Sequence, residues 1–379
     1  MTGKERVTNV IARKPVDKIP LGFYAVDCDT VSRVLGRKTF VRDKIATVLA
    51  LAEGRRDEVA ESFKKDSVEF YRKMDCADLI IPKEAALLPP KDYEPSPLKK
   101  IADNRLEDRQ GRIFQSVVEA NDLMCVFDPT LKKDYTVADF SSEPVVVTPP
   151  DDSVFEALDY LIAELGGERY VCSQAGIVVM PMLGDFDSAM TAYALQPEVI
   201  HATSRREIEI LKKTAGAYVR KGSAGVHTGS DTAGTNGPFI SPAMFRELCL
   251  PYMKESVAII KQFTEQINFH DCGMNIPLMD MFIEAGIDCY QSLQTTAGME
   301  IGKLTTMFGD RLTFWGGVPV ETLIMGTPDE TRKEVRHAME IGSRNGGLIL
   351  GPSHSIAYGV KYDNFMAMVD EYVKLRDKI

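Results

Sequence analysis

The stretch Asn268-Phe269-His270-Asp271-Cys272-Gly273 completes a short apolar run that begins at residue 266, and a loop and a helical pattern follow it. Short apolar runs of this kind are typical of buried strands. Similar runs alternate with helical segments along the chain and cover residues 19–24, 77–82, 170–174, 224–228, 266–270, 287–291, 312–318 and 347–351. Strands that alternate with helices form parallel βα units. Eight of them predict an α/β fold of the closed (β/α)8, or TIM barrel, type.

The rival architecture is a doubly wound open sheet. The sequence has no Gly-x-Gly-x-x-Gly between a strand and a helix, so a dinucleotide-binding sheet has little support. Within the barrel we expect an insertion in the N-terminal half, at about residues 89–150, a stretch rich in proline and charge. Its polar segment 106–114 predicts a β-hairpin with Gly111 at the turn. We interpret the whole chain, residues 1–379, as a single domain.

Two helix starts are marked clearly in the second half of the chain. Thr327-Pro328-Asp329-Glu330 places threonine at the N-cap, proline at the first helical position and glutamate at the third. This order predicts a capping box in front of a helix. Ser241-Pro242 predicts another helix start of the same kind.

Composition excludes several classes of function. The 379 residues are 44% hydrophobic and 26% charged, with a net charge of −10 and no basic block, which disfavours nucleic-acid binding. Seven cysteines form an odd count without framework spacing and indicate a reducing compartment. The N-terminus lacks a hydrophobic signal segment and no apolar run reaches transmembrane length. We therefore expect a cytoplasmic protein that is not bound to a membrane. A core of this size needs no structural metal, so any metal is expected to be catalytic.

Two strand ends carry possible metal ligands. His270 and Cys272 lie two residues apart on an extended segment, so their side chains can point the same way. His354 follows the last predicted strand in Leu350-Gly351-Pro352-Ser353-His354-Ser355. Together they would supply three ligands to zinc and leave one position open for substrate. The alternative is a buried histidine beside a structural cysteine; the strand-end position, and the turn that Gly273 permits, favour the metal site.

The other histidines carry less signal. His201 and His337 fall in helical stretches where exposure is expected, and His227 ends a strand without a cysteine nearby. We therefore assign these three no role in the site.

Acidic residues form the next set of candidates. Asp231 follows the fourth strand in a loop of small residues that lets backbone approach a ligand, although an Asx-turn is the alternative. Asp185 is a candidate for substrate binding, but capping of the following helix is the favoured interpretation for it and for Asp187. Asp27 and Asp29 follow the first strand. With Glu84 they predict an acidic rather than a basic barrel mouth, and Asp27 is a candidate for substrate binding.

Aromatic residues also lie at strand ends. We assign Phe23 and Trp315 to the core. Tyr24 and Tyr290 carry hydroxyl groups that need partners when buried, so both are candidates for substrate contact.

Several segments resemble the uroporphyrinogen decarboxylase superfamily, and the resemblance spans nearly the whole chain. They are residues 6–20, residues 231–251 with Ser241-Pro242-Ala243-Met244-Phe245, Gly316-Gly317-Val318 with residues 326–330, and residues 347–354. The resemblance implies a (β/α)8 barrel, in agreement with the strand count. Uroporphyrinogen decarboxylases carry an arginine-rich motif after the first strand, whereas this chain has no basic residue between Lys18 and Arg33. Porphyrinogen carboxylates would lack charged partners there, which argues against that activity.

The other branch of the superfamily comprises cobalamin-dependent methyltransferases, whose zinc ligands are His-x-Cys followed by a distant Cys. His270 and Cys272 match this pattern, and His354 stands in Pro352-Ser353-His354 where the family has Pro-Gly-Cys. Histidine is also a competent zinc ligand. The resemblance thus implies zinc as cofactor, and cobalamin carried by a corrinoid protein as partner. Asp231 or Glu84 is a possible fourth ligand, and a homodimer is possible.

The function implied is a corrinoid-dependent methyltransferase that moves a methyl group between a small methoxylated or N-methylated compound and a cobalamin protein, as an O-demethylase does. Zinc would act as a Lewis acid, with Asp231 or Tyr24 orienting the substrate or handling a proton. Three alternatives stay open. The same site could methylate an acceptor from methylcobalamin. It could be a metal-free decarboxylase of a small carboxylic acid, with His270 or His354 as proton donor. The barrel could also be a non-catalytic binding protein.

Overall fold

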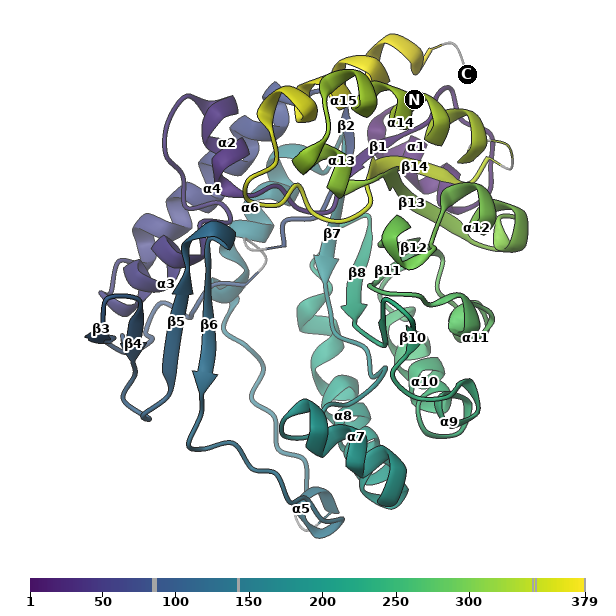
Figure 1. Ribbon diagram of the computed structural model, residues 1–379. Helices are drawn as coiled ribbons and strands as arrows, with labels where there is room; N and C mark the ends of the chain where they lie inside the picture. The colour runs from purple at the N-terminus through teal and green to yellow at the C-terminus, as the bar shows by residue number, and fades with distance from the viewer. Residues whose placement is uncertain (84–86, 142–143, 343, 345, 378–379) are drawn as a thin grey trace.

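The protein is a closed barrel of parallel strands, as the computed structural model shows for residues 1–83, 87–141, 144–342, 344 and 346–377 (Figure 1). The strands, in their order around the barrel, are β1 (Leu21–Phe23), β2 (Ala77–Ile80), β7 (Tyr170–Gln174), β8 (Gly225–Ser230), β11 (Ile267–Asp271), β12 (Cys289–Gln291), β13 (Thr313–Val318) and β14 (Leu348–Pro352). The pairing of Leu21 with Leu350 joins β1 to β14 and closes the barrel. The predicted α/β class and (β/α)8 barrel are confirmed, and every predicted strand run overlaps one of these strands, although β8, β11 and β14 extend one or two residues beyond the predicted ends.

Helices surround the barrel and cover its outer face (Figure 1). They are α2 (Cys28–Leu35), α3 (Lys44–Ala52), α4 (Arg56–Lys73), α6 (Glu156–Leu165), α7 (Phe186–Leu195), α8 (Pro197–Tyr218), α9 (Pro242–Leu248), α10 (Leu250–Ile260), α11 (Met279–Ala285), α12 (Ile301–Phe308), α13 (Val320–Met325), α14 (Pro328–Gly342) and α15 (Tyr362–Leu375). Among the described residues, none of the helices combines the length and the apolar character needed to cross a membrane.

Both predicted helix starts are confirmed. Thr327 receives a hydrogen bond from the backbone N–H of Glu330, and the Glu330 carboxylate accepts the Thr327 N–H at 2.8 Å in return. Ser241 caps α9 by accepting the N–H of Met244.

The core has two layers. The large outer layer lies between the strands and the helices and includes Phe23, whose ring packs against Phe365 of α15 at 5.5 Å. A smaller inner cluster fills the barrel and contains Tyr170 and Trp315, both fully buried. The Trp315 indole N–H donates to the carbonyl of Gly22 at 3.1 Å. The prediction that Phe23 and Trp315 belong to the core is confirmed, although only Trp315 lies inside the barrel.

Helix α1 (Gly3–Ile11) lies across the N-terminal end of the barrel and contributes Val7, Val10 and Ile11 to the inner cluster. A buried ion pair at 2.6 Å joins Arg6 of this helix to Asp78 of β2. One end of the barrel is therefore sealed, and the carboxyl ends of the strands are left for the site.

The predicted insertion lies between β2 and β7. It forms a four-stranded antiparallel sheet, shown in Figure 1 at the side of the barrel next to α3. Its elements are β3 (Lys99–Ala102), β4 (Arg105–Glu107), β5 (Ile113–Val117), η1 (Val118–Ala120) and β6 (Asp122–Phe127), followed by α5 (Ala138–Ser141) and η2 (Asp152–Phe155). The predicted hairpin is confirmed as β4 and β5, with Gly111 in the turn at a φ of +78°. The sequence reasoning missed β3 and β6, which flank the hairpin.

Short elements complete the strand-to-helix loops at the carboxyl end of the barrel. These are the two-stranded β9 (Ala233–Gly234) and β10 (Gly237–Pro238), η3 (Ile276–Leu278) and η4 (Thr295–Ala297).

Candidate functional site

A cavity of about 500 Å³ opens at the carboxyl ends of the barrel strands. It is lined by Tyr24, Lys83, Leu87, Gln174, Ala175, Gly176, Tyr218, His227, Thr228, Gly229, Ser230, Asp231, His270, Cys272 and His354. Six of the eight barrel strands contribute a residue at or just beyond their ends, which is the arrangement expected of a functional site in this fold.

The His-x-Cys pair lies where β11 meets its loop, with both side chains turned the same way. Cys272 Sγ lies 3.2 Å from His270 Nε2. The other ring nitrogen of His270 is hydrogen-bonded to the side-chain oxygen of Gln291, the last residue of β12. Because an amide oxygen only accepts, His270 carries its proton on Nδ1 and turns an unprotonated Nε2 towards the thiol. This is the tautomer that a metal ligand requires, held by the kind of partner that orients ligating histidines.

His354 completes the cluster from the loop after β14. One ligand atom from each of His270, Cys272 and His354 lies within 4.8 Å of the others. Ligand atoms around a tetrahedral zinc are separated by about 3.3–3.6 Å, as follows from metal–ligand distances of about 2.0–2.3 Å. The 3.2 Å sulfur–nitrogen separation approaches that value, and two imidazoles with one thiol form a donor set that zinc accepts. We call these three residues the ligand cluster; the structure brings them together as the sequence reasoning expected.

Burial sets the charge of the ligand cluster. It lowers the pKa of His270 well below its ordinary value and also lowers that of His354, so both rings are held in the neutral form that binds metals. Burial raises the pKa of the Cys272 thiol to about 12. The hydroxyl of Ser292 donates to Cys272 Sγ at 3.3 Å and favours the thiolate.

The backbone around Cys272 is unusual at two points. Gly273 has a φ of +85°, and a Cβ at this position would lie 2.3 Å from the carbonyl oxygen of Ala233. Only glycine fits this turn. Ser292 has a φ of +90°, which is costly for a residue with a side chain. Backbone strain of this kind often accompanies functional sites, and here it directs the Ser292 hydroxyl at the thiol.

Tyr24 packs directly on the ligand cluster. Its ring stacks on His270 with centroids 4.2 Å apart and planes 2° from parallel. Its hydroxyl accepts a hydrogen bond from Lys83 Nζ, and the same ammonium lies 4.5 Å from the centre of the ring. Asp231 lies at the exposed edge of the cavity, where its carboxylate accepts the backbone N–H of Cys272 at 3.4 Å. Both predicted catalytic residues therefore lie beside the ligand cluster.

Tyr290 does not reach the cavity, contrary to our expectation of substrate contact. It is fully buried, and its hydroxyl donates to the backbone carbonyl of Asp271 at 2.6 Å. The amide of Asn275 donates to the same hydroxyl. The carboxylate of Asp271 accepts the N–H and hydroxyl of Thr232, and burial raises its pKa to about 8. Tyr290 therefore has a structural role. Its hydroxyl is hydrogen-bonded to Asp271 and Asn275, on either side of Cys272, and so holds the turn that carries Cys272.

The two other predicted substrate-binding residues also have structural partners. Asp27 is buried, pairs with Arg42 and accepts the N–H of Tyr358 at 2.9 Å, so it ties the loop after β1 to the loop after β14. Asp185 caps α7 by accepting the N–H of Ser188 at 2.9 Å, which confirms the N-cap interpretation, and it pairs with Lys133. Neither carboxylate is among the residues that line the cavity.

The acidic barrel mouth that we expected from Asp27, Asp29 and Glu84 is also corrected by the structure. Asp29 accepts the N–H groups of Gly359 and Thr30 instead of facing substrate. Glu84 lies outside the described residues. Lys83, which the sequence reasoning did not consider, brings a positive charge into the cavity. The described part of the mouth thus combines one lysine with Asp231.

His227, Gln174 and Gln291 are the other residues that the sequence reasoning missed. His227 is 4% exposed, lines the cavity and lies edge-on to Tyr24 at 5.3 Å. We expected no role for it because no cysteine is near it in the sequence. Their position could have identified all three residues, because each lies at or near the carboxyl end of a predicted barrel strand, as His270 does.

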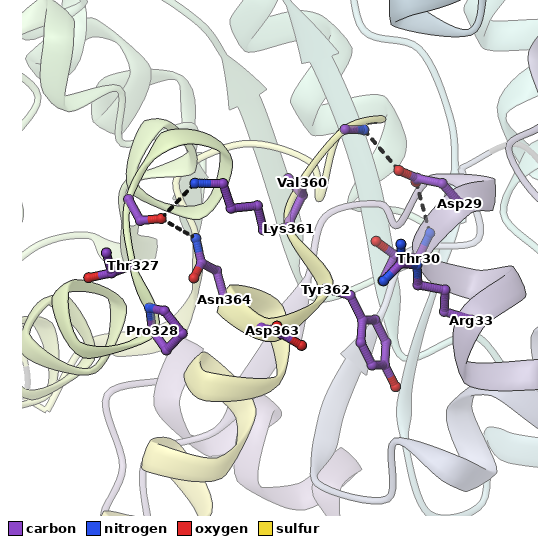
Figure 2. Close-up of a pocket in the computed structure, with 12 residues that line it drawn as sticks. Asp29, Thr30, Arg33, Thr327, Pro328, Val360, Lys361, Tyr362, Asp363 and Asn364 are labelled. Carbon is purple, nitrogen blue, oxygen red and sulfur yellow. Dashed lines mark hydrogen bonds between the residues drawn. The ribbon is translucent and has the colours of Figure 1, made fainter.

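A separate hollow of about 560 Å³ lies at the barrel rim between α2 and the starts of α14 and α15. In Figure 2, Lys361 and Asn364 both point to the carbonyl of Gly326, and Asp29 faces Thr30. Its lining contains no histidine or cysteine. We therefore assign the chemistry to the cavity with the ligand cluster.

Comparison with known proteins gives a match in family and in fold. A family model described as "Uroporphyrinogen decarboxylase (URO-D)" matches residues 128–375, a range that includes the whole ligand cluster. No curated protein matches the sequence.

Among solved structures, a methyltransferase from Methanosarcina mazei superimposes with a TM-score of 0.63 at 16% identity, and the alignment covers 99% of each chain. At this identity the likeness shows the fold. A GH10 xylanase with a bacterial Ig-like domain from termite gut gives a TM-score of 0.33 at 6% identity, over 57% of this chain and 63% of that one.

Proposed function

Because the chain belongs to the uroporphyrinogen decarboxylase (URO-D) family, we propose that it is a methyltransferase whose His270, Cys272 and His354 hold a zinc ion. The observation that carries the proposal is the convergence of one thiol and two neutral imidazoles at the ends of β11 and β14. The bond from His270 to Gln291 supports it, because that bond leaves the inward-facing nitrogen free to bind a metal. The fold shared with the Methanosarcina mazei methyltransferase is consistent with this activity.

The reaction we propose moves a methyl group from a small methoxylated or N-methylated compound to a reduced corrinoid on a separate protein. Bound zinc would supply Lewis acidity at the heteroatom that carries the methyl group. The carbon–heteroatom bond breaks with its electron pair going to the heteroatom, which takes up a proton. The methyl carbon bonds to an electron pair of the reduced corrinoid. The same site run in the opposite sense would methylate an acceptor.

The residues around the ligand cluster have roles that suit this methyl transfer. Tyr24 covers one face of His270 and excludes water from it. Asp231 holds the backbone at Cys272 and presents an exposed carboxylate at the cavity edge, where it can deliver or accept the proton of the heteroatom. Lys83 fixes the Tyr24 hydroxyl. None of these tasks requires a change in the backbone of the barrel.

Metal-free decarboxylation of a small acid is the second candidate function. The observation that favours it is Lys83, since a cation in the cavity suits a carboxylate substrate. Neutral His270 or His354 would then handle the proton that replaces the lost carbon dioxide.

Metal content decides between the two candidates. Protein purified without a histidine tag or chelator is analysed by plasma mass spectrometry, and about one zinc per chain is expected for a single catalytic site. The same protein is mixed with cob(I)alamin and a methoxylated compound, and methyl transfer is followed by absorbance.

The matched variants are Cys272→Ala and Cys125→Ala, the second at an exposed cysteine of the insertion. We expect Cys272→Ala to lose both zinc and methyl transfer, and Cys125→Ala to keep both. Full activity of Cys272→Ala, or no zinc after reconstitution, would sink the methyltransferase proposal and leave decarboxylation.

A further inference from the structure

The wall of the cavity built by β7 and β8 contains polar groups that have no role in the ligand cluster. Strands β7 and β8 are neighbours in the barrel (Figure 1). Gln174 ends β7, and its register partner on β8 is His227. Strand residues two apart face the same side. Gln174 and Cys172 therefore share a face, and Cys172 belongs to the inner cluster of the barrel. Gln174 and His227 are thus side by side on the inner wall, and both line the cavity.

Both side chains have a buried nitrogen without a partner. Gln174 Nε2 and His227 Nδ1 find no hydrogen-bond partner among the residues that the structure describes. His227 is 4% exposed. Buried polar groups are nearly always hydrogen-bonded in folded proteins, and exceptions call for an explanation. Two exceptions on adjacent strands, facing one cavity, are explained if a ligand supplies the missing acceptor.

The charge of this wall indicates what the ligand is. Gln174 Nε2 can only donate, and a neutral imidazole donates from one of its nitrogens. Lys83 brings the positive charge, and its proximity contributes, after burial, to the lowered pKa of His227. Asp231, the acidic residue of the cavity, lies instead beside Cys272. The described lining is therefore rich in donors along β7 and β8, and Lys83 adds a positive charge over the ring of Tyr24, which itself stacks on His270.

We propose that Lys83, Gln174 and His227 bind a carboxylate of the substrate, so that the methylated compound is a small carboxylic acid. This rests on the proposed methyl transfer for the other end of the substrate, whose heteroatom lies at the ligand cluster. A cavity of about 500 Å³ suits a compound of this size. Ala175, Gly176 and Tyr218 line the same cavity and can accept its carbon skeleton. The three residues act as specificity determinants, because they discriminate substrates by charge.

The test compares acids with amides of the same shape. Binding of methoxyacetate and 3-methoxybenzoate, and of the two corresponding amides, is measured by calorimetry and by saturation-transfer NMR. We expect each acid that binds to do so about tenfold or more tightly than its amide, as the loss of a charge-assisted hydrogen bond implies. Equal binding of acid and amide, or binding of no acid, overturns the proposal.

Variants assign the effect to this wall. Lys83→Met and Gln174→Met should bring the affinity for the acid close to that for the amide. The matched control Lys254→Met removes an exposed lysine of α10 that pairs with Glu284, and it should leave both affinities unchanged. If Lys83→Met fails to fold, Gln174→Met alone decides. An acid that binds both Lys83→Met and Gln174→Met as tightly as the parent protein overturns the assignment.

A last variant separates this proposal from the proposed function. Cys272→Ser should lose zinc and methyl transfer but keep the preference for acid over amide, since Lys83, Gln174 and His227 are unchanged and the ring of His227 lies 6.4 Å from that of His270. If the parent protein lacks zinc and still prefers acids, methyl transfer fails and the carboxylate site stands. If it holds zinc and transfers methyl groups without preferring acids, the carboxylate site fails alone.

Discussion

Replacement of Gln291 by leucine tests the ligand cluster most directly. Gln291 is fully buried at the end of β12, and its side-chain oxygen accepts the Nδ1–H of His270. Its amide nitrogen faces the carbonyl of Ser353, in the loop that carries His354, at 3.5 Å. Leucine has a similar volume and opens no large void, so the change removes hydrogen bonding and leaves packing in place.

The magnitude follows from what is left unpaired. Without its acceptor, the buried Nδ1–H of His270 costs about 1–3 kcal/mol in the free energy of unfolding of the metal-free protein. The ring also loses the partner that fixes its tautomer and orientation. Loss of such a partner lowers metal affinity by about 10–100-fold, which corresponds to about 1.4–2.8 kcal/mol of binding free energy.

The assay is a competition for zinc between the protein and a chromophoric chelator, combined with urea unfolding of the metal-free form. Gln266→Leu is the matched control. Gln266 is 6% exposed, and its side chain donates to the carbonyl of Thr8 and accepts from the hydroxyl of Tyr170 at the sealed end of the barrel. We expect similar destabilisation in both variants but weaker zinc binding only in Gln291→Leu. Equal zinc affinity in Gln291→Leu and the parent protein would refute the reasoning.

Three further predictions concern other parts of the molecule. Gly351→Ala places a Cβ 2.3 Å from the carbonyl oxygen of Gly22 and must push β14 away from β1. We expect the free energy of unfolding to fall by about 1–3 kcal/mol; thermal unfolding measures this, and an unchanged Tm would contradict it. Asp231→Asn keeps the shape of the side chain but removes the carboxylate to which we assign the proton of the heteroatom; methyl transfer should fall by about 100-fold at unchanged zinc content, and a parallel loss of zinc would point to a role in holding the metal. Burial raises the pKa of Glu207 from 4.5 to about 7, so its contribution to stability is fully present below pH 4.5 and is lost as pH rises through 7. Glu207→Gln should therefore raise the free energy of unfolding by up to about 2–3 kcal/mol at pH 8 and leave it unchanged at pH 4. Denaturant unfolding at the two pH values measures both changes, and equal changes would contradict the prediction.

The site was predictable where its signal is local. His270 and Cys272 are two residues apart on one strand, and alternation of side chains along a strand turns both the same way. His354 could be grouped with them because all barrel strands deliver their carboxyl ends to one face. The N-cap role of Asp185 was predictable for the same kind of reason, since capping involves only the next three residues.

The remaining site residues could not be assigned from local patterns. Tyr24 and Tyr290 both follow or end a predicted strand, yet one stacks on His270 and the other points into the core below the turn. The ring of Tyr24 meets residues from strands far away in the sequence, whereas Tyr290 meets residues of β11, its loop and α11, which directly precede it. Asp27 looked free because its partner Arg42 lies beyond the next helix and pairs with it only after the loop folds back.

The sequence by itself determined the alternation of strands and helices, the helix caps and the two strand ends that carry the ligand cluster. Each of these depends on hydrophobic period or on contacts within a few residues. Only the tertiary structure decided that His227, Gln174 and Lys83 share one cavity wall and that Gln291 orients His270. Closure and register of the barrel bring those groups together, and both are set by packing between segments that are distant along the chain.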